Sequence, residues 1–232
     1  MTGDRPAFRD YEVEVPSTAE SAPRQLRDLY GTLPGARSPS LLVALIDDGV
    51  DPSHPAIAGR LEARLAIGSQ GVPGSHATQV AGLIVGVPEP GFAGGLAPSE
   101  TRLLDIDVRD GVGAVSSAAI ADGIRIAVEH GADIVNLSLA LSRRDSGIED
   151  ALAAAEEAGV IVVASTRNDV VDEASYPADY RSVIGVTSVT DGGDLAPLAT
   201  LASAELHRQS HGHRSGSRTT SGRWSGGRTS DA

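Results

Sequence analysis

The sequence contains no cysteine, few aromatic residues and no long apolar run. Without cysteine there is no disulfide and no thiolate metal site. Aromatic residues are 3% of the chain and hydrophobic residues 41%, so aliphatic side chains must build the core, as in a layered parallel sheet. No apolar segment approaches the roughly 18 residues of a membrane-spanning helix, and the charged amino terminus lacks an apolar signal core. We therefore expect a cytoplasmic protein that binds no membrane.

Net charge is −12 and unevenly distributed. Residues 203–232 hold five arginines against two acidic residues, so the tail is basic and the body strongly acidic. An acidic body repels phosphate, which argues against nucleic acid as a partner. The 232 residues are enough for one α/β domain with a sizeable core.

The segment Leu41–Pro55, LLVALIDDGVDPSHP, has the pattern of a buried parallel strand followed by a turn. The six apolar residues Leu41–Ile46 run without alternation into Asp47. In an open α/β sheet, ligands and catalytic groups gather at the carboxyl ends of the strands, so Asp47 is a candidate site residue. The alternative is that Asp47 only caps the turn.

The segment Gly74–Val85, GSHATQVAGLIV, predicts a helix with His76 in its first turn. The positive end of the helix dipole disfavours an imidazolium, so we expect His76 to be neutral and able to accept a proton. A strand-end aspartate followed by a helix-start histidine is the order in which a carboxylate orients a general base for a nucleophilic serine.

These two segments resemble the Asp and His boxes of the subtilisin-like serine proteases, the subtilases. Where the family usually has Gly-His-Gly-Thr-His-Val-Ala-Gly, this chain has Ser75-His76-Ala77-Thr78-Gln79-Val80-Ala81-Gly82. The resemblance implies an α/β, doubly wound, mainly parallel sheet with helices on both faces. It also implies peptide hydrolysis through an Asp/His/Ser triad in which Asp47 orients His76. No cofactor and no metal ligands are expected, although the family permits structural calcium.

Further periodic segments predict the rest of this domain. Apolar runs predict strands at 61–67, 102–108, 133–141 and 160–164, and helical spacing predicts helices at 116–131 and 148–158.

Two stretches, the turn after the 102–108 strand and part of the 133–141 strand, resemble the substrate-binding edges of subtilases. The resemblance implies that Gly111–Gly113 and the residues Ser138, Leu139 and Ala140 flank an extended peptide and hold it by strand addition. Ala140 replaces a common glycine, and the alternative is ordinary strand and turn. The expected partner is therefore a peptide or protein substrate in extended conformation, while the oligomeric state is left open.

The segment Ser165–Asp169 lies where subtilases usually have Ala-Ala-Gly-Asn. The resemblance implies that the Asn168 amide stabilises the oxyanion. Arg167 stands in place of a glycine, whose backbone freedom the loop would favour. The following segment Tyr176–Val186, YPADYRSVIGV, matches the family pattern closely.

Around Gly192 the resemblance stops. Residues 192–232 are rich in serine, glycine and arginine, with Trp224 as the one large hydrophobe, which predicts a disordered tail. The tail histidines His207, His211 and His213 have no cysteine beside them, which favours a loose polar tail over a metal site.

Ser230, in Arg-Thr-Ser-Asp-Ala, echoes the family's Gly-Thr-Ser-x-Ala nucleophile box. The sequence printed stops two residues later, without the helix that would position the hydroxyl. Ser230 is thus a nucleophile candidate that lacks the positioning helix. We expect a truncated or frame-shifted product in which the C-terminal part of the fold is incomplete, and which is inactive as printed because its serine box is missing or displaced.

The predicted organisation is an amino-terminal arm or pro-segment remnant over 1–40, a partial catalytic domain over 41–191 and the tail over 192–232. Two other functions remain open. A catalytically silent module could keep the peptide groove. A nucleotide-binding α/β domain would need a glycine-rich loop after the first strand, where this chain has Asp48 and Asp51.

Overall fold

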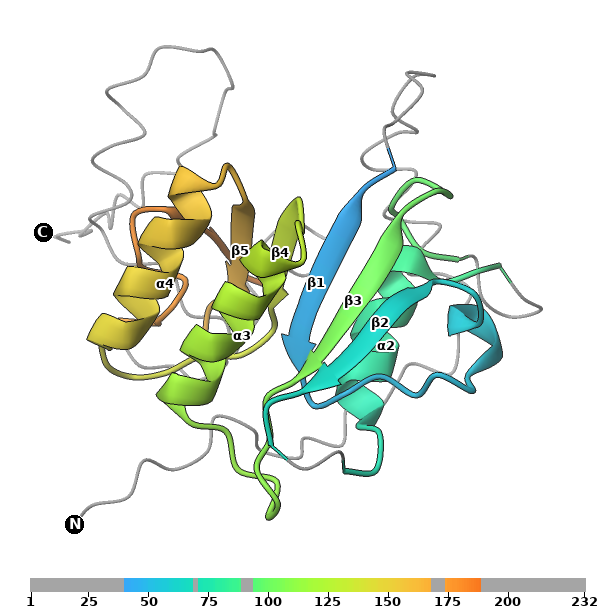
Figure 1. Ribbon diagram of the computed structural model, residues 1–232, viewed down its shortest axis with the longest axis horizontal. Helices are drawn as coiled ribbons and strands as arrows, with labels where there is room; N and C mark the ends of the chain where they lie inside the picture. Colours follow the sequence, from blue (N-terminus) through green and yellow to red (C-terminus); the bar gives the residue numbers. More distant parts are fainter. Residues whose placement is uncertain (1–39, 69–70, 89–93, 168–173, 189–232) are drawn as a thin grey trace, which may run out of the picture.

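The computed structural model describes residues 40–68, 71–88, 94–167 and 174–188, which form a parallel sheet with helices on both faces (Figure 1). The strands are β1 (Leu42–Asp47), β2 (Leu61–Ala66), β3 (Arg102–Asp107), β4 (Ile134–Leu137), β5 (Ile161–Ser165) and β6 (Val183–Val186). The helices are the 3-10 turn η1 (Pro55–Ile57) and the α-helices α2 (Ser75–Val85), α3 (Ser117–Glu129) and α4 (Ser146–Glu157). Within these ranges, no helix has the length and apolar character needed to cross a membrane.

The strand order is β2-β3-β1-β4-β5-β6, with every pair parallel. Strand β1 lies between β3 and β4, and the chain passes from β3 to β4 through α3. The direction of strand addition therefore reverses beside β1, which is where open α/β sheets bind their ligands. Asp47 is the last residue of β1, in register with Asp107 of β3.

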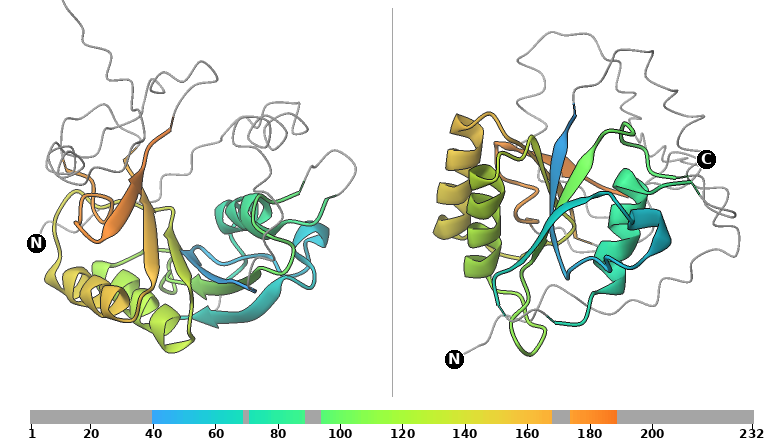
Figure 2. Two further views of the ribbon diagram at one scale, coloured as in Figure 1. Left: turned by 90° about the horizontal axis from the view of Figure 1, so that it is seen from above. Right: turned by 45° about the vertical axis from the view of Figure 1, so that its right-hand side comes forward.

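Alternate residues of β1 supply two different cores. Val43 and Leu45 pack with Ala77 and Ala81 of α2. Ala44 and Ile46 point the other way, into the cluster that contains the buried residues of α3 and α4. Figure 2 shows α3 and α4 side by side on one face of the sheet and α2 on the opposite face. The predicted doubly wound α/β architecture is confirmed.

Most element boundaries differ by a residue or two from the sequence-based predictions, and two of the differences have a clear cause. The strand expected over 133–141 is too long, because β4 ends at Leu137 and the chain leaves the ladder. Leu141 instead forms an antiparallel bridge with Tyr176, whose N–H donates to the Leu141 carbonyl at 2.9 Å. Helix α4 begins two residues earlier than expected, because the Asp145 side chain accepts hydrogen bonds from the N–H groups of its first turn.

Candidate active site

The Asp47 carboxylate and the His76 imidazole meet at the carboxyl end of β1. His76 Nδ1 lies 2.9 Å from Asp47 Oδ1 and 3.0 Å from Oδ2. Asp47 is fully buried, whereas the His76 side chain is 45% exposed. A carboxylate only accepts hydrogen bonds, so Nδ1 carries the hydrogen and Nε2 is the ring nitrogen that can take a proton. The arrangement predicted from chain order is thus present.

The loop after β1 is tied to the first turn of α2. The Gly74 N–H donates to the Gly49 carbonyl at 2.7 Å, and Thr78 Oγ1 donates to the Gly74 carbonyl at 2.8 Å. The same hydroxyl accepts the Asp51 N–H at 2.9 Å. These bonds hold the start of the histidine helix against the end of the aspartate strand.

The protonation of His76 differs from the sequence-based expectation. The hydrogen bond to Asp47 raises the pKa of His76 above its ordinary 6.5, burial opposes this, and the charges of Asp47 and Asp48 raise it further. The expectation that the imidazolium is disfavoured is therefore wrong. A helix dipole contributes about 0.3 to 1 kcal/mol at an exposed end, less than a directly bonded carboxylate. His76 is neutral only above its raised pKa.

Strand β3 contributes a buried carboxylate beneath the same loop. Asp105 is fully buried and accepts hydrogen bonds from the Val50 N–H at 2.9 Å and from Arg64 Nε at 3.1 Å. Its Oδ1 has no hydrogen-bond partner among the described residues. Burial raises the pKa of Asp105 to about 6, and the bonds from Val50 and Arg64 only partly oppose it.

A second β3 carboxylate fixes the loop before His76. Asp107 accepts from Arg109 Nη2 at 2.7 Å and from Arg109 Nε at 3.0 Å. Arg109 Nη2 also donates to the Val72 carbonyl at 2.9 Å. Sequence reasoning did not single out these residues, although acidic residues at alternate positions of a buried strand, RLLDIDV, were a usable signal.

Asp105 should make stability depend on pH. Between about pH 4 and 6 the folded protein keeps a proton that the unfolded chain releases, so this group's contribution falls as pH rises. A pKa of about 6 against an ordinary 3.8 corresponds to about 3 kcal/mol. The Asp105→Asn variant has no titrating group at position 105. We therefore expect the unfolding free energy of wild type, measured relative to this variant, to fall by about 3 kcal/mol between pH 4 and 7. Urea unfolding measures it, and parallel pH curves would contradict it.

The predicted substrate segments lie at the same edge of the sheet. The loop around Gly111–Gly113 is held by Asp110, whose Oδ1 accepts the N–H groups of Val112 at 3.0 Å and Ala114 at 2.8 Å. Gly113 has φ +82°, a conformation that favours glycine. The Val112 side chain at the loop tip is 88% exposed. The loop is thus preorganised and presents an apolar side chain to solvent.

The second predicted substrate segment follows β4. Ser138 Oγ accepts a hydrogen bond from Asn136 Nδ2 at 2.9 Å. Leu139 is 4% exposed and belongs to the core, so its side chain is not presented to a peptide. Ala140 lies between Leu139 and the bridge at Leu141. Substrate contact by these residues stays a prediction.

Several predicted residues lie outside the described part of the chain: Asn168, Ser230 and the tail histidines His207, His211 and His213. Arg167 is described, and its N–H donates to Ser175 Oγ at 2.8 Å. Among the described residues no non-glycine residue has a positive φ, so Arg167 does not occupy a conformation reserved for glycine.

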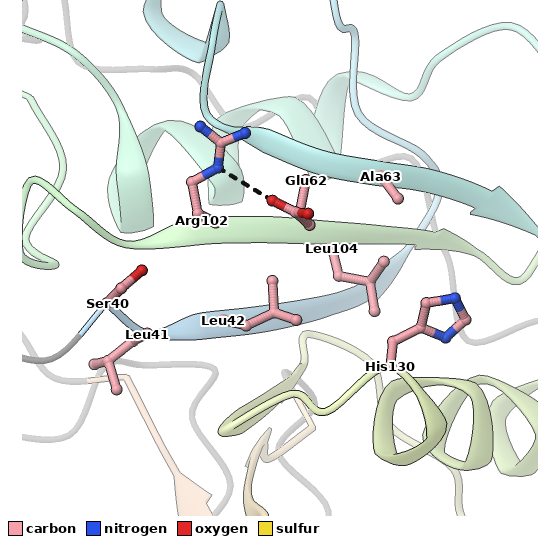
Figure 3. Close-up of a pocket in the computed structure, with 8 residues that line it drawn as sticks. All are labelled: Ser40, Leu41, Leu42, Glu62, Ala63, Arg102, Leu104 and His130. Atoms are coloured by element: carbon pink, nitrogen blue, oxygen red, sulfur yellow. Dashed lines mark ion pairs between the residues drawn. The ribbon is translucent and has the colours of Figure 1, made fainter.

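A hollow of about 300 Å³ lies at the opposite edge of the sheet, where β1 and β3 begin (Figure 3). It contains both a serine and a histidine, but they do not form a catalytic pair. Ser40 Oγ donates to the Glu100 carbonyl, and His130 Nδ1 faces the Ile126 carbonyl at 2.8 Å. Figure 3 shows the two side chains at opposite ends of the hollow. The chemistry therefore belongs to the edge with Asp47.

Asp47, Asp48 and His76 each offer one oxygen or nitrogen atom within 4.8 Å of the others, as metal ligands would. Their hydrogen bonds account for this closeness. His76 donates to Asp47, and Asp48 accepts the N–H of Ala77 at 2.8 Å. We assign no metal to this group.

The sequence pattern of the Subtilase family matches residues 38–226 of this chain. The chain belongs to the subtilase family. The match runs past Gly192, where the sequence analysis places the end of the resemblance, and stops before Ser230. The family assignment agrees with the sheet and with the Asp47–His76 pair at its carboxyl edge.

Known subtilases and solved structures are similar to this chain. Thermitase of Thermoactinomyces vulgaris is 30% identical over 69% of this chain and 59% of its own length. The thermostable alkaline protease of Halalkalibacterium halodurans is 33% identical over 75% of this chain and 46% of its own length. The chain thus spans less than two thirds of these relatives. Among structures, the prenylagaramide maturation protease PagA gives a TM-score of 0.64 at 28% identity, covering 78% of this chain and 65% of PagA. The self-cleaved protease domain of PatA gives a TM-score of 0.60 at 28% identity, covering 70% of this chain and 62% of the PatA domain.

Proposed function

We propose that this subtilase is a serine endopeptidase in which Asp47 orients His76 and His76 is the general base. The observation that carries the proposal is the bond from His76 Nδ1 to the buried Asp47 carboxylate, which leaves Nε2 as the ring nitrogen that accepts a proton. As a serine Oγ attacks the scissile carbonyl, its proton moves to Nε2. The peptide C–N bond then breaks, and the amine leaves with that proton. Water releases the acyl group by the same route.

The remaining parts of the reaction are assigned by the family pattern. Asn168 is proposed as a donor to the oxyanion, a role whose loss typically costs about 10²- to 10³-fold in turnover. Gly111–Gly113 and Ser138–Ala140 are proposed to hold an extended peptide by backbone pairing. One relative named above is a protease by its name, and PagA is named a maturation protease, which supports a peptide or protein substrate. The mechanism uses protein groups and calls for no cofactor.

Labelling with a fluorophosphonate, followed by peptide mapping, tests the reaction and names its serine. We expect any adduct on this protein to require His76, because the probe reacts with a serine whose proton is accepted by a base. Ser230 is the candidate for the labelled residue. An adduct that is lost in His76→Ala establishes a serine nucleophile activated by His76, as the proposed peptidase mechanism requires.

The same experiment decides about the silent alternative. A folded protein that takes up no label while His76 still titrates as a residue bonded to Asp47 would be a peptide-binding module without a nucleophile. That outcome overturns the proposed activity for this chain and supports the expectation that it is inactive as printed. Label uptake that persists in His76→Ala would remove Asp47 and His76 from the mechanism.

A further inference from the structure

Asp48, the residue after Asp47, reaches across to the helix that carries His76. Its Oδ1 accepts the N–H of Ala77 at 2.8 Å, across 29 positions of sequence. Helix α2 begins at Ser75, and its N-cap, Gly74, makes no side-chain capping bond. The N–H groups of a first helical turn need an acceptor from outside the helix. Asp48 supplies one from the end of the neighbouring strand.

The space around Asp48 is adapted to this contact. A Cβ added to Gly74 would lie 1.9 to 2.1 Å from the carboxyl atoms of Asp48, far closer than atoms can approach. Any side chain at position 74 would therefore displace the Asp48 carboxylate. Glycine at the N-cap has no side chain to cap the helix, and this leaves space for the Asp48 carboxylate to do so.

Asp48 also acts on the charges of the site. Its N–H donates to Asp47 Oδ1 at 2.8 Å, which helps to fix the carboxylate that His76 contacts. The negative charge of Asp48 adds to that of Asp47 beside the imidazole. Burial raises the pKa of Asp48, and the positive charge of Arg109, which is paired with Asp107, opposes this. Helix α2 itself has no acidic residue in its first turn.

We propose that Asp48 is a positioning residue for His76: it caps α2 so that the imidazole is held against Asp47, and it places a second negative charge beside the ring. The effect on catalysis rests on the proposed function. The cap and the charge are properties of the folded chain and can be measured without turnover.

Two variants separate the two roles of Asp48. Asp48→Asn keeps a side-chain oxygen for the Ala77 N–H but removes the charge, and Asp48→Ala removes both. In an NMR titration, with the His76 signal assigned by its loss in His76→Ala, we expect Asp48→Asn to lower the pKa of His76, because a negative charge beside the imidazole is removed. Exchange of the Ala77 amide hydrogen should speed up roughly fivefold in Asp48→Ala and stay unchanged in Asp48→Asn.

Asp51→Asn is the matched control. It removes one negative charge from the same loop, but the Asp51 carboxylate bonds to Ser53 rather than to α2. We expect this variant to leave the pKa of His76 and the exchange of Ala77 unchanged.

The proposal is overturned if Asp48→Asn titrates like wild type, or if Asp48→Ala leaves exchange at Ala77 unchanged. Should Asp48→Ala not fold, the comparison of Asp48→Asn with Asp51→Asn still decides. Because both readouts need no turnover, a failure of fluorophosphonate labelling counts against the proposed function alone. An unchanged pKa of His76 counts against the role of Asp48 alone.

Discussion

Replacement of His76 by alanine is expected to lower peptide hydrolysis by about 10⁶-fold, the typical cost of losing the base of a serine triad. Without the imidazole, Asp47 is too deeply buried to take a proton from a serine hydroxyl, and only binding and oxyanion stabilisation remain. The expectation applies to any form of the protein that turns over peptide, the 232-residue chain or a longer product with a Gly-Thr-Ser-x-Ala box. Hydrolysis of a chromogenic peptide measures it.

The control for this experiment is His130→Ala. His130 is exposed, follows α3 and lines the hollow at the amino ends of the strands. Its removal changes the number of histidines without touching the Asp47 edge of the sheet, so turnover should stay at the wild-type level. Equal turnover in His76→Ala and His130→Ala would show that His76 is not the general base.

The central strands and the Asp47–His76 contact could be predicted from sequence because their signals are local. Six apolar residues ending in an aspartate predict a buried strand, and β1 occupies that position. The helical pattern after Gly74 predicts α2, with His76 in its first turn. Parallel strands bring their carboxyl ends to one edge, so the chain order of aspartate and histidine was enough to place them together.

The parts that could not be predicted depend on contacts between distant residues. Val50 and Asp105 are 55 positions apart, and no local pattern shows that the carboxylate of a β3 residue accepts the N–H of the loop after β1. The direction of the His76 pKa shift was wrong for a different reason. The sequence analysis weighed only the helix dipole, although it also placed Asp47 against His76, and the hydrogen bond to Asp47 is the largest cause of the raised pKa.

The end of β4 is a further example of a distant contact. An apolar run continues through Leu141, so the sequence predicts a longer strand. Leu141 pairs instead with Tyr176, which is remote in sequence, and this draws the chain out of the parallel ladder after Leu137. Ser138–Ala140 are left outside the strand, as a segment proposed to bind a peptide must be.

Asp47→Asn is expected to lower turnover by about 10⁴-fold while leaving His76 in place. An asparagine can still accept the Asp48 N–H that Asp47 Oδ1 accepts at 2.8 Å, so the loop should keep its shape. The asparagine amide has an NH2 group as well as an oxygen, so it can donate a hydrogen bond to His76 Nδ1 instead of accepting one from it. The imidazole then adopts the tautomer with hydrogen on Nε2, which cannot accept the serine proton. NMR of the ring nitrogens reports the tautomer directly.

The pH dependence of this variant separates tautomer from protonation. The bond to Asp47 is the largest cause of the raised pKa of His76, so in wild type the acid limb of kcat/KM should lie above pH 6.5. Removing the carboxylate charge lowers that pKa, and the acid limb should move to lower pH. At pH 6 a larger fraction of His76 is thus neutral in the variant than in wild type. Even at its own pH optimum, the variant should turn over about 10⁴-fold more slowly than wild type. A profile in which Asp47→Asn regains wild-type turnover at any pH would show that Asp47 acts only through the protonation of His76, and not by orienting it.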